Sequence, residues 1–267
     1  MPYEGSPVID ADAHVVETER TWDFLRTNDA HFKPVLFTSP ESQLFQYWFV
    51  QGEQIGLRER KFTDEQLQQM SEQTGYDLYA PQAARQLDDV KLRLNHMDEL
   101  GIDVQVMHNT LWLLHVSDRP DVEVALSRAY NRWLADIWRQ GEGRLRWACV
   151  LPTLDMTEAL EELRFSRSNG AVAVGLQALT HGRSIVDPYF YPIYAEAEKL
   201  GMAIAVHISN GSPEAFDIWM SPYDRGAFFL PLRMPTVAAC YAQVTGELPH
   251  LFPKLRWAYV EATAQWI

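Results

Sequence analysis

The chain contains 267 residues, of which 47% are hydrophobic, and its formal net charge at pH 7 is −13. This length and hydrophobic content suffice to bury the core of one large domain of about 250 residues. The negative charge disfavours binding to nucleic acid and to anionic membranes, because their phosphates would repel the protein, so we expect a small-molecule partner.

Neither the cysteines nor the N-terminal residues indicate secretion. Cys149 and Cys240 lie far apart and are too few for a disulfide framework or a zinc finger. The N-terminal segment MPYEGSPVID lacks the basic and apolar regions of a signal peptide, and no run of about 18 apolar residues occurs. We therefore expect a soluble cytoplasmic protein without a membrane segment.

Buried strands alternate with amphipathic helices along the chain. The strands are expected to begin near Val8, Asp103, Arg146, Val172, Ala203 and Arg256, with helical segments at 84–100, 121–140, 155–168 and 188–200. Before three of these strands, a glycine stands where a helix C-terminus requires positive φ. The alternation predicts an α/β fold with a parallel sheet, and the spacing suits a barrel and a doubly wound sheet equally well.

Two long segments interrupt this alternation. Residues 18–83 are rich in aromatic residues and glutamine, and residues 209–250 contain five prolines. Both segments follow the C-terminal end of a strand, where barrel enzymes build their active sites from loops. We interpret them as insertions that form lids or substrate walls, and the alternative is that they only cover the barrel or form oligomer contacts.

No seventh or eighth strand follows the one near Arg256 before the sequence ends at Ile267. We therefore expect residues 1–267 to form a single but incomplete domain of about six strands, taken from a longer (β/α)8 TIM barrel. Such a sheet would have two open edges and an exposed apolar interior, which favours self-association into a homo-oligomer and low activity of the fragment.

The first strand carries a carboxylate and an imidazole at adjacent positions of one face. In VIDADAHVVE, Asp12 and His14 are two residues apart, so their side chains point to the same side of a strand. Aspartate and histidine are common metal ligands, and a bound metal would explain why they are paired. The alternative is a strand end whose polar groups cap the next helix.

The fifth strand, MAIAVHISNG, contains His207 near its end. If His207 faces the interior of the fold, Ala203 and Ala205 face it too, because side chains alternate along a strand. These small side chains would leave room for an ion beside the imidazole. The alternative is a structural histidine that is held by hydrogen bonds.

Three further residues are candidates for chemistry or substrate contact. Glu261, at the end of the sixth strand, is a candidate metal ligand, proton shuttle or partner of a bound water, and the alternative is a salt bridge to an arginine. His108, after the second strand, and Arg85 are candidate substrate contacts. Motifs for nucleotide binding, serine hydrolases, zincins and thioredoxin-like proteins are absent from the sequence.

Five segments carry a resemblance to a known family. They are VIDADAHVVE, RQLDDVKLRLNHMDELGIDVQVMH, PTLD, DPYFYPIYAEAEKLGMAIAVH and FPKLRWAYVEATAQWI. In this order they resemble the amidohydrolase-related family of metal-dependent barrels, which includes aminocarboxymuconate-semialdehyde decarboxylase. Such proteins bind metal through a His-x-His or Glu-x-His pair on the first strand, a His on the fifth and an Asp on the eighth. The resemblance implies that Asp12, His14 and His207 bind a divalent metal ion, with zinc favoured over manganese or iron.

Two positions depart from the family pattern. Asp12 stands where His or Glu is usual, and its oxygen remains a suitable ligand for zinc, manganese or iron. The sixth-strand position that many members give to a catalytic His holds Tyr259, with Glu261 two residues later. Proton transfer by the usual imidazole is therefore in question, and the eighth-strand Asp would lie beyond Ile267.

These observations support four hypotheses for function. The leading one is metal-dependent hydrolysis of a small organic substrate through a metal-activated water. The second is nonoxidative decarboxylation of an aromatic or enoic acid at the same centre. The third is an iron or manganese oxygenase, since a carboxylate with imidazoles also suits nonheme iron. The fourth is an inactive partner subunit that has kept the barrel without its chemistry.

Overall fold

The structure is a computed structural model that describes residues 5–38, 45–60, 63–75, 80–209 and 232–262. Residues 210–231, which fall in the predicted insertion at 209–250, lie outside the described residues.

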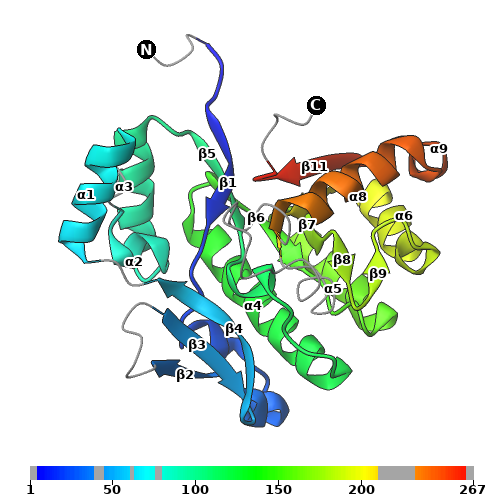
Figure 1. The fold of residues 1–267 in the computed structure, drawn as a ribbon, viewed down its shortest axis with the longest axis horizontal. Coiled ribbons are helices and arrows are strands. Elements are labelled where there is room, and N and C mark those ends of the chain that lie inside the picture. Colours follow the sequence, from blue (N-terminus) through cyan, green and yellow to red (C-terminus); the bar gives the residue numbers. More distant parts are fainter. Residues whose placement is uncertain (1–4, 39–44, 61–62, 76–79, 210–231, 263–267) are drawn as a thin grey trace, which may run out of the picture.

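Six parallel strands form a curled sheet in the order β1-β5-β6-β7-β10-β11 (Figure 1). They are β1 (Ile9–His14), β5 (Val104–His108), β6 (Leu145–Val150), β7 (Ala171–Gln177), β10 (Ala203–His207) and β11 (Arg256–Val260). Each strand begins within one residue of its predicted start. The predicted parallel α/β fold is thereby confirmed.

Helices connect successive strands of this sheet and cover one of its faces. They are α3 (Val90–Leu100), α4 (Pro120–Gln140), α5 (Met156–Ser168), α6 (Tyr191–Leu200), α8 (Met234–Thr245) and α9 (Leu248–Leu251), with short 3-10 turns at η3 (Leu111–Leu113) and η4 (Pro188–Phe190). A small hairpin of β8 (Leu179–Thr180) and β9 (Arg183–Ser184) follows β7.

Local sequence signals set the ends of these helices. Asp89 and Asp155 cap the N-termini of α3 and α5 by accepting hydrogen bonds from backbone N–H groups of the first turn. Gly101 and Gly201 end α3 and α6 in the left-handed conformation, with φ of 69° at both. Helix and strand are thus joined by a tight turn in which a residue with a side chain would be strained.

The two faces of the sheet bury side chains of different size. The helix-covered face contributes large residues such as Trp147, Ile204 and Val206 to the main core. The opposite face contributes a small cluster of three alanines, Ala148, Ala173 and Ala205. This separation agrees with the expected alternation along the fifth strand, and it leaves an open cavity of about 650 Å³ between β1 and β11.

The segment from residue 18 to residue 83 contains an antiparallel sheet and several helices, the first two beside α4 and the last two beside α3 (Figure 1). Its elements are η1 (Thr21–Phe24), η2 (Thr27–Phe32), β2 (Val35–Thr38), β3 (Phe45–Val50), β4 (Glu53–Arg60), α1 (Asp64–Thr74) and α2 (Gln82–Arg85). The rings of Trp22 and Trp48 meet edge to face at 5.7 Å, and both pack in a second core with Leu126 of α4. Much of this segment is therefore anchored to the barrel helices by its own apolar core.

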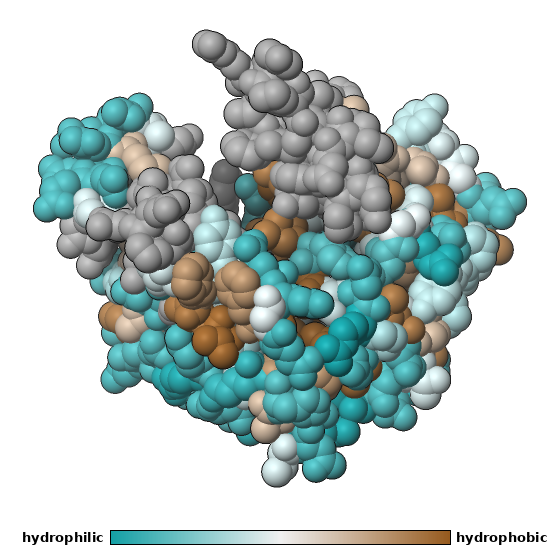
Figure 2. Space-filling view, turned by 60° about the horizontal axis from the view of Figure 1, so that its bottom comes forward, coloured by the Kyte–Doolittle hydropathy of each residue, from teal (hydrophilic) through white to brown (hydrophobic). Residues whose placement is uncertain are grey.

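The molecular surface in Figure 2 is largely hydrophilic, and hydrophobic side chains gather there only in small patches. Among the described residues, no helix combines the length and the apolar character that a membrane span requires.

Gly170, between α5 and β7, offers a direct test of this packing. Its φ is +92°, and a Cβ atom at this position would lie 2.4 Å from ring atoms of Trp138 on α4. Gly170→Ala is expected to destabilise the protein, because overpacking typically costs about 1–3 kcal/mol and positive φ adds strain. Urea denaturation followed by circular dichroism measures the change.

Gly201→Ala is the matched control. Gly201 also follows a helix with positive φ, but a Cβ atom there would meet nothing within 4 Å. This variant reports the backbone strain alone, so the difference between the two variants measures the contact with Trp138. Equal losses of stability in both variants would contradict the packing argument.

Candidate metal centre

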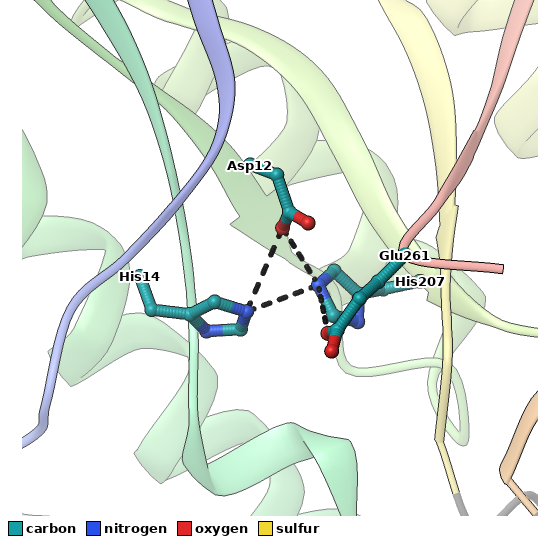
Figure 3. A group of neighbouring side chains, drawn as sticks. All are labelled: Asp12, His14, His207 and Glu261. Atoms are coloured by element: carbon teal, nitrogen blue, oxygen red, sulfur yellow. Dashed lines mark hydrogen bonds and ion pairs between the residues drawn. The ribbon is translucent and has the colours of Figure 1, made fainter. Parts of the chain in front are cut away.

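Asp12 and His14 lie in the C-terminal half of β1. Within this strand, the register of its pairing with β5 shifts between Asp10 and Ala13. Asp10 is tied to the neighbouring strand, because Gln105 Nε2 donates a hydrogen bond to its Oδ2 at 2.9 Å. Asp12 and His14 instead point toward β10, as Figure 3 shows. The sequence prediction that these two side chains share one face therefore agrees with the structure.

Asp12, His14 and His207 converge on one point (Figure 3). His207 Nε2 lies 3.1 Å from His14 Nε2 and 3.1 Å from Asp12 Oδ1. The distance between His14 Nε2 and Asp12 Oδ1 is 3.7 Å. Ligands at about 2.0–2.1 Å from a tetrahedral metal are about 3.3–3.4 Å apart, so this triangle has the dimensions of three metal ligands.

The hydrogen bonds of the two imidazoles also fit a metal. His14 Nδ1 donates to the backbone carbonyl of Asn109 at 3.1 Å, and His207 Nδ1 donates to that of Ile208 at 3.0 Å. Because a carbonyl oxygen only accepts, each neutral ring carries its proton on Nδ1 and a lone pair on Nε2. Two lone pairs that face each other repel, and a cation between them removes the repulsion.

Electrostatics keeps the ligands in the forms that bind metal. Burial and the neighbouring His207 lower the pKa of His14 to about 4, so this ring is neutral at pH 7. Burial alone would raise the pKa of Asp12, but the neighbouring imidazoles, His207 above all, hold the pKa below its usual value. A neutral imidazole beside an ionised carboxylate is the donor set that zinc, manganese and iron accept.

Glu261 follows β11 and completes the group of four side chains in Figure 3. Its Oε2 lies 3.8 Å from His207 Nε2, and its backbone adopts a positive φ of 61°. Burial raises the pKa of this carboxyl. Glu261 thus stands where a fourth ligand or a proton donor would be placed.

The two predicted substrate contacts, His108 and Arg85, and Tyr259, which stands where the family pattern has a His, differ in their distance from this centre. His108 is buried, and its ring lies 5.3 Å from that of His207. Arg85 ends α2, accepts a backbone hydrogen bond from Val16, and is absent from the described lining of the cavity beside the centre. The hydroxyl of Tyr259 donates a hydrogen bond to Gln243 Oε1 on α8 at 3.2 Å. The structure therefore brings only His108 of these three beside the imidazoles.

A cavity of about 60 Å³ adjoins the centre, and its wall includes His108 and His207. Sequence reasoning missed several polar residues of this wall, which are His115, Glu123, Gln177 and His181. His115 lies in the loop after β5 and His181 in the hairpin after β7. The rule that barrel sites gather at the C-terminal ends of strands was the signal that would have found them.

Comparison with known proteins identifies the family. Residues 9–263 match the family model described as amidohydrolase. The chain belongs to the amidohydrolase family. A curated relative of this amidohydrolase is 2-amino-3-carboxymuconate-6-semialdehyde decarboxylase from Dictyostelium discoideum, with 21% identity over 189 residues that cover 64% of the chain. The aligned part spans about half of that relative's length, 52%.

Solved structures share the fold of this amidohydrolase. An amidohydrolase from Mycobacterium avium subsp. paratuberculosis K-10 has a TM-score of 0.72 and 17% identity over 99% of the chain and 75% of its own. The 5-carboxyvanillate decarboxylase from Sphingomonas paucimobilis has a TM-score of 0.58 and 16% identity, and the match covers 94% of the chain and 66% of that protein. The 4-oxalomesaconate hydratase from Rhodopseudomonas palustris has a TM-score of 0.53 and 18% identity, and the match covers 94% of the chain and 61% of that protein. The six-stranded sheet is thus an incomplete (β/α)8 barrel.

Proposed function

We propose that this amidohydrolase is a metal-dependent carboxy-lyase, which removes the carboxyl group of a small aromatic or enoic acid as CO2. The observation that carries the proposal is the pair of imidazole Nε2 atoms, 3.1 Å apart, that face each other beside the Asp12 carboxylate. The sequence alone favours hydrolysis. The decarboxylase relative moves our preference to decarboxylation.

The residues of the centre divide the work. Asp12, His14 and His207 would hold the divalent ion, for which zinc is our first choice and manganese or iron the alternatives. Such an ion supplies Lewis-acid polarisation of carboxylate or hydroxyl oxygens of the substrate. Glu261 would carry a proton at its carboxyl group toward the carbon that loses CO2, in keeping with its raised pKa.

His108 would orient the substrate from a position beside the two imidazoles, because its ring lies 5.3 Å from that of His207 and 6.3 Å from that of His14. Its Nε2 donates to the backbone carbonyl of Ala11 at 3.0 Å, which leaves Nδ1 as a hydrogen-bond acceptor. Burial lowers the pKa of His108, so the ring is neutral at pH 7. A neutral acceptor can bind a hydroxyl or amino group of the substrate without repelling the metal.

Hydrolysis is the second candidate, because three protein ligands would leave one position of a tetrahedral metal for a water molecule. In this reaction the same three residues would hold the ion, and Glu261 would accept a proton from the attacking water.

Product analysis in water enriched with oxygen-18 separates the two reactions. We expect 5-carboxyvanillate, the acid named for one of the solved structures, to lose one CO2 for each organic product formed, with no oxygen-18 in that product. Mass spectrometry of both products makes the measurement. Aryl esters and amides serve as hydrolysis substrates in parallel.

The His14→Ala/His207→Ala variant is the control for metal-dependent turnover. Oxygen-18 in an acid released from the esters or amides, without CO2 from any acid, would sink the carboxy-lyase proposal and leave hydrolysis. No turnover of either substrate class by metal-loaded protein would count against both reactions.

A further inference from the structure

A second group of potential ligands lies beside the same cavity, whose wall includes two of its members, His115 and His181. His115 Nε2 is 3.3 Å from Asp118 Oδ1, and His181 Nδ1 is 3.5 Å from the same oxygen. The two imidazole rings meet edge to face with centroids 5.4 Å apart. His115 and Asp118 come from the loop between β5 and α4, whereas His181 comes from the turn between β8 and β9.

Glu123 fixes the orientation of His181. This buried carboxylate accepts hydrogen bonds from the backbone N–H of Leu154 at 2.8 Å and from the hydroxyl of Thr153 at 3.1 Å. It also accepts from His181 Nε2 at 3.1 Å. The remaining nitrogen, His181 Nδ1, then carries a lone pair in the neutral ring. A carboxylate that holds the outer nitrogen of a histidine is the usual support of a metal-binding imidazole.

His181 Nδ1 is buried and, apart from its contact with Asp118 Oδ1 at 3.5 Å, has no polar partner within the described part of the chain. A buried nitrogen without a hydrogen bond costs free energy, and metal coordination removes that cost. His181 also holds a positive φ of 48°, so the turn keeps the ring in place at the expense of backbone strain. Both features are explained if the ring has a ligand to bind.

We infer that His115, Asp118 and His181 form a second site for a divalent transition metal, with Glu123 as the positioning residue of His181. The two distances of 3.3 and 3.5 Å match the spacing of about 3.3–3.4 Å between tetrahedral ligands. Two imidazoles and one carboxylate are a donor set that suits zinc. None of these residues belongs to the centre around Asp12, so this inference does not depend on the proposed reaction.

An ion pair is the competing explanation of the same contacts. A protonated His181 would lie between the carboxylates of Glu123 and Asp118, and although burial alone would lower the pKa of His181, these carboxylates raise it. In the ion pair, His181 Nδ1 holds a proton, whereas in the metal site the same nitrogen binds zinc. A direct measurement of zinc binding therefore decides between the two.

The test uses the His14→Ala/His207→Ala variant, stripped of metal with a chelator and titrated with Zn2+ in a calorimeter. We expect one equivalent of Zn2+ to bind with proton release. Adding Asp118→Asn or His115→Ala is expected to weaken this binding more than tenfold, because a ligand is lost. Adding Glu123→Gln is expected to weaken it about 10–100-fold, the usual effect of losing an orienting partner.

Asp121→Asn is the matched control, because Asp121 pairs with Arg119 and contacts neither imidazole. Asp118 is 85% exposed, so its replacement leaves the folded core intact, which thermal melts of each variant verify. Absence of Zn2+ binding in the double variant overturns the inference. The inference is also overturned if the variant with Asp118→Asn binds Zn2+ as tightly as the variant with Asp121→Asn.

Discussion

Replacing both His14 and His207 by alanine is expected to remove one equivalent of bound divalent metal from the protein. The two Nε2 atoms lie 3.1 Å apart, and both Nδ1 atoms already donate hydrogen bonds to backbone carbonyls. Asp12 then remains as a partly exposed carboxylate with a nearby Glu261. Loss of an orienting partner alone costs about 10–100-fold in affinity, and loss of two ligands costs more.

Mass spectrometry of metal in the purified protein makes this measurement. The control is a His31→Ala/His250→Ala variant, which removes two exposed histidines from η2 and α9. The control should keep the metal content of the unmodified protein. An unchanged metal content in the His14→Ala/His207→Ala variant would show that these imidazoles do not bind metal.

Glu162→Ala is expected to cause the largest loss of stability among single substitutions considered. Glu162 lies on α5 and is 1% exposed, yet its carboxylate meets Arg128, Arg132 and the side-chain amide of Asn131 on α4. Removing one partner of a buried ion pair typically costs about 3–5 kcal/mol, because the other charges lose their partner. The free energy of unfolding from urea denaturation measures this loss.

Glu161→Ala is the matched control at the neighbouring position. Its side chain is 59% exposed and approaches Arg128 only to 3.8 Å, so we expect a change within about 0.5 kcal/mol. Asn131 also holds both backbone groups of Val150, a residue of the cavity wall. A loss below 1 kcal/mol for Glu162→Ala would mean that solvent replaces the network.

The strands could be predicted from the sequence because each has a buried apolar run, and before three of the six a glycine adds a second, independent signal. A buried apolar run such as that before His207 has few alternatives in a chain of this length, and a glycine marks where it starts. The approach of His14 to His207 follows from the curled sheet, because three strands separate β1 from β10 and the curl brings the C-terminal ends of these two strands together. Family membership was predicted from five segments together and is confirmed by the match over residues 9–263.

The remaining features depend on contacts that periodicity does not encode. His115 and His181 lie in loops, and their approach depends on the turn at β8 and β9. Glu162 is the one glutamate of α5 that is buried, so the spacing of charged residues along this helix does not reveal its burial. The prediction that Arg85 contacts substrate rests on its place in the sequence alone and stays a prediction. In the structure Arg85 ends α2, and its backbone carbonyl accepts a hydrogen bond from Val16.

The alanines on the inner face of the sheet separate the size of the substrate from the chemistry of the centre. Ala148, Ala173 and Ala205 lie on three neighbouring strands and supply none of the candidate ligands. Exchange of one alanine for valine adds two methyl groups to the floor of the barrel and leaves each imidazole in place. A larger side chain at one of these positions would therefore reduce the space above the sheet and leave the proposed metal ligands in place.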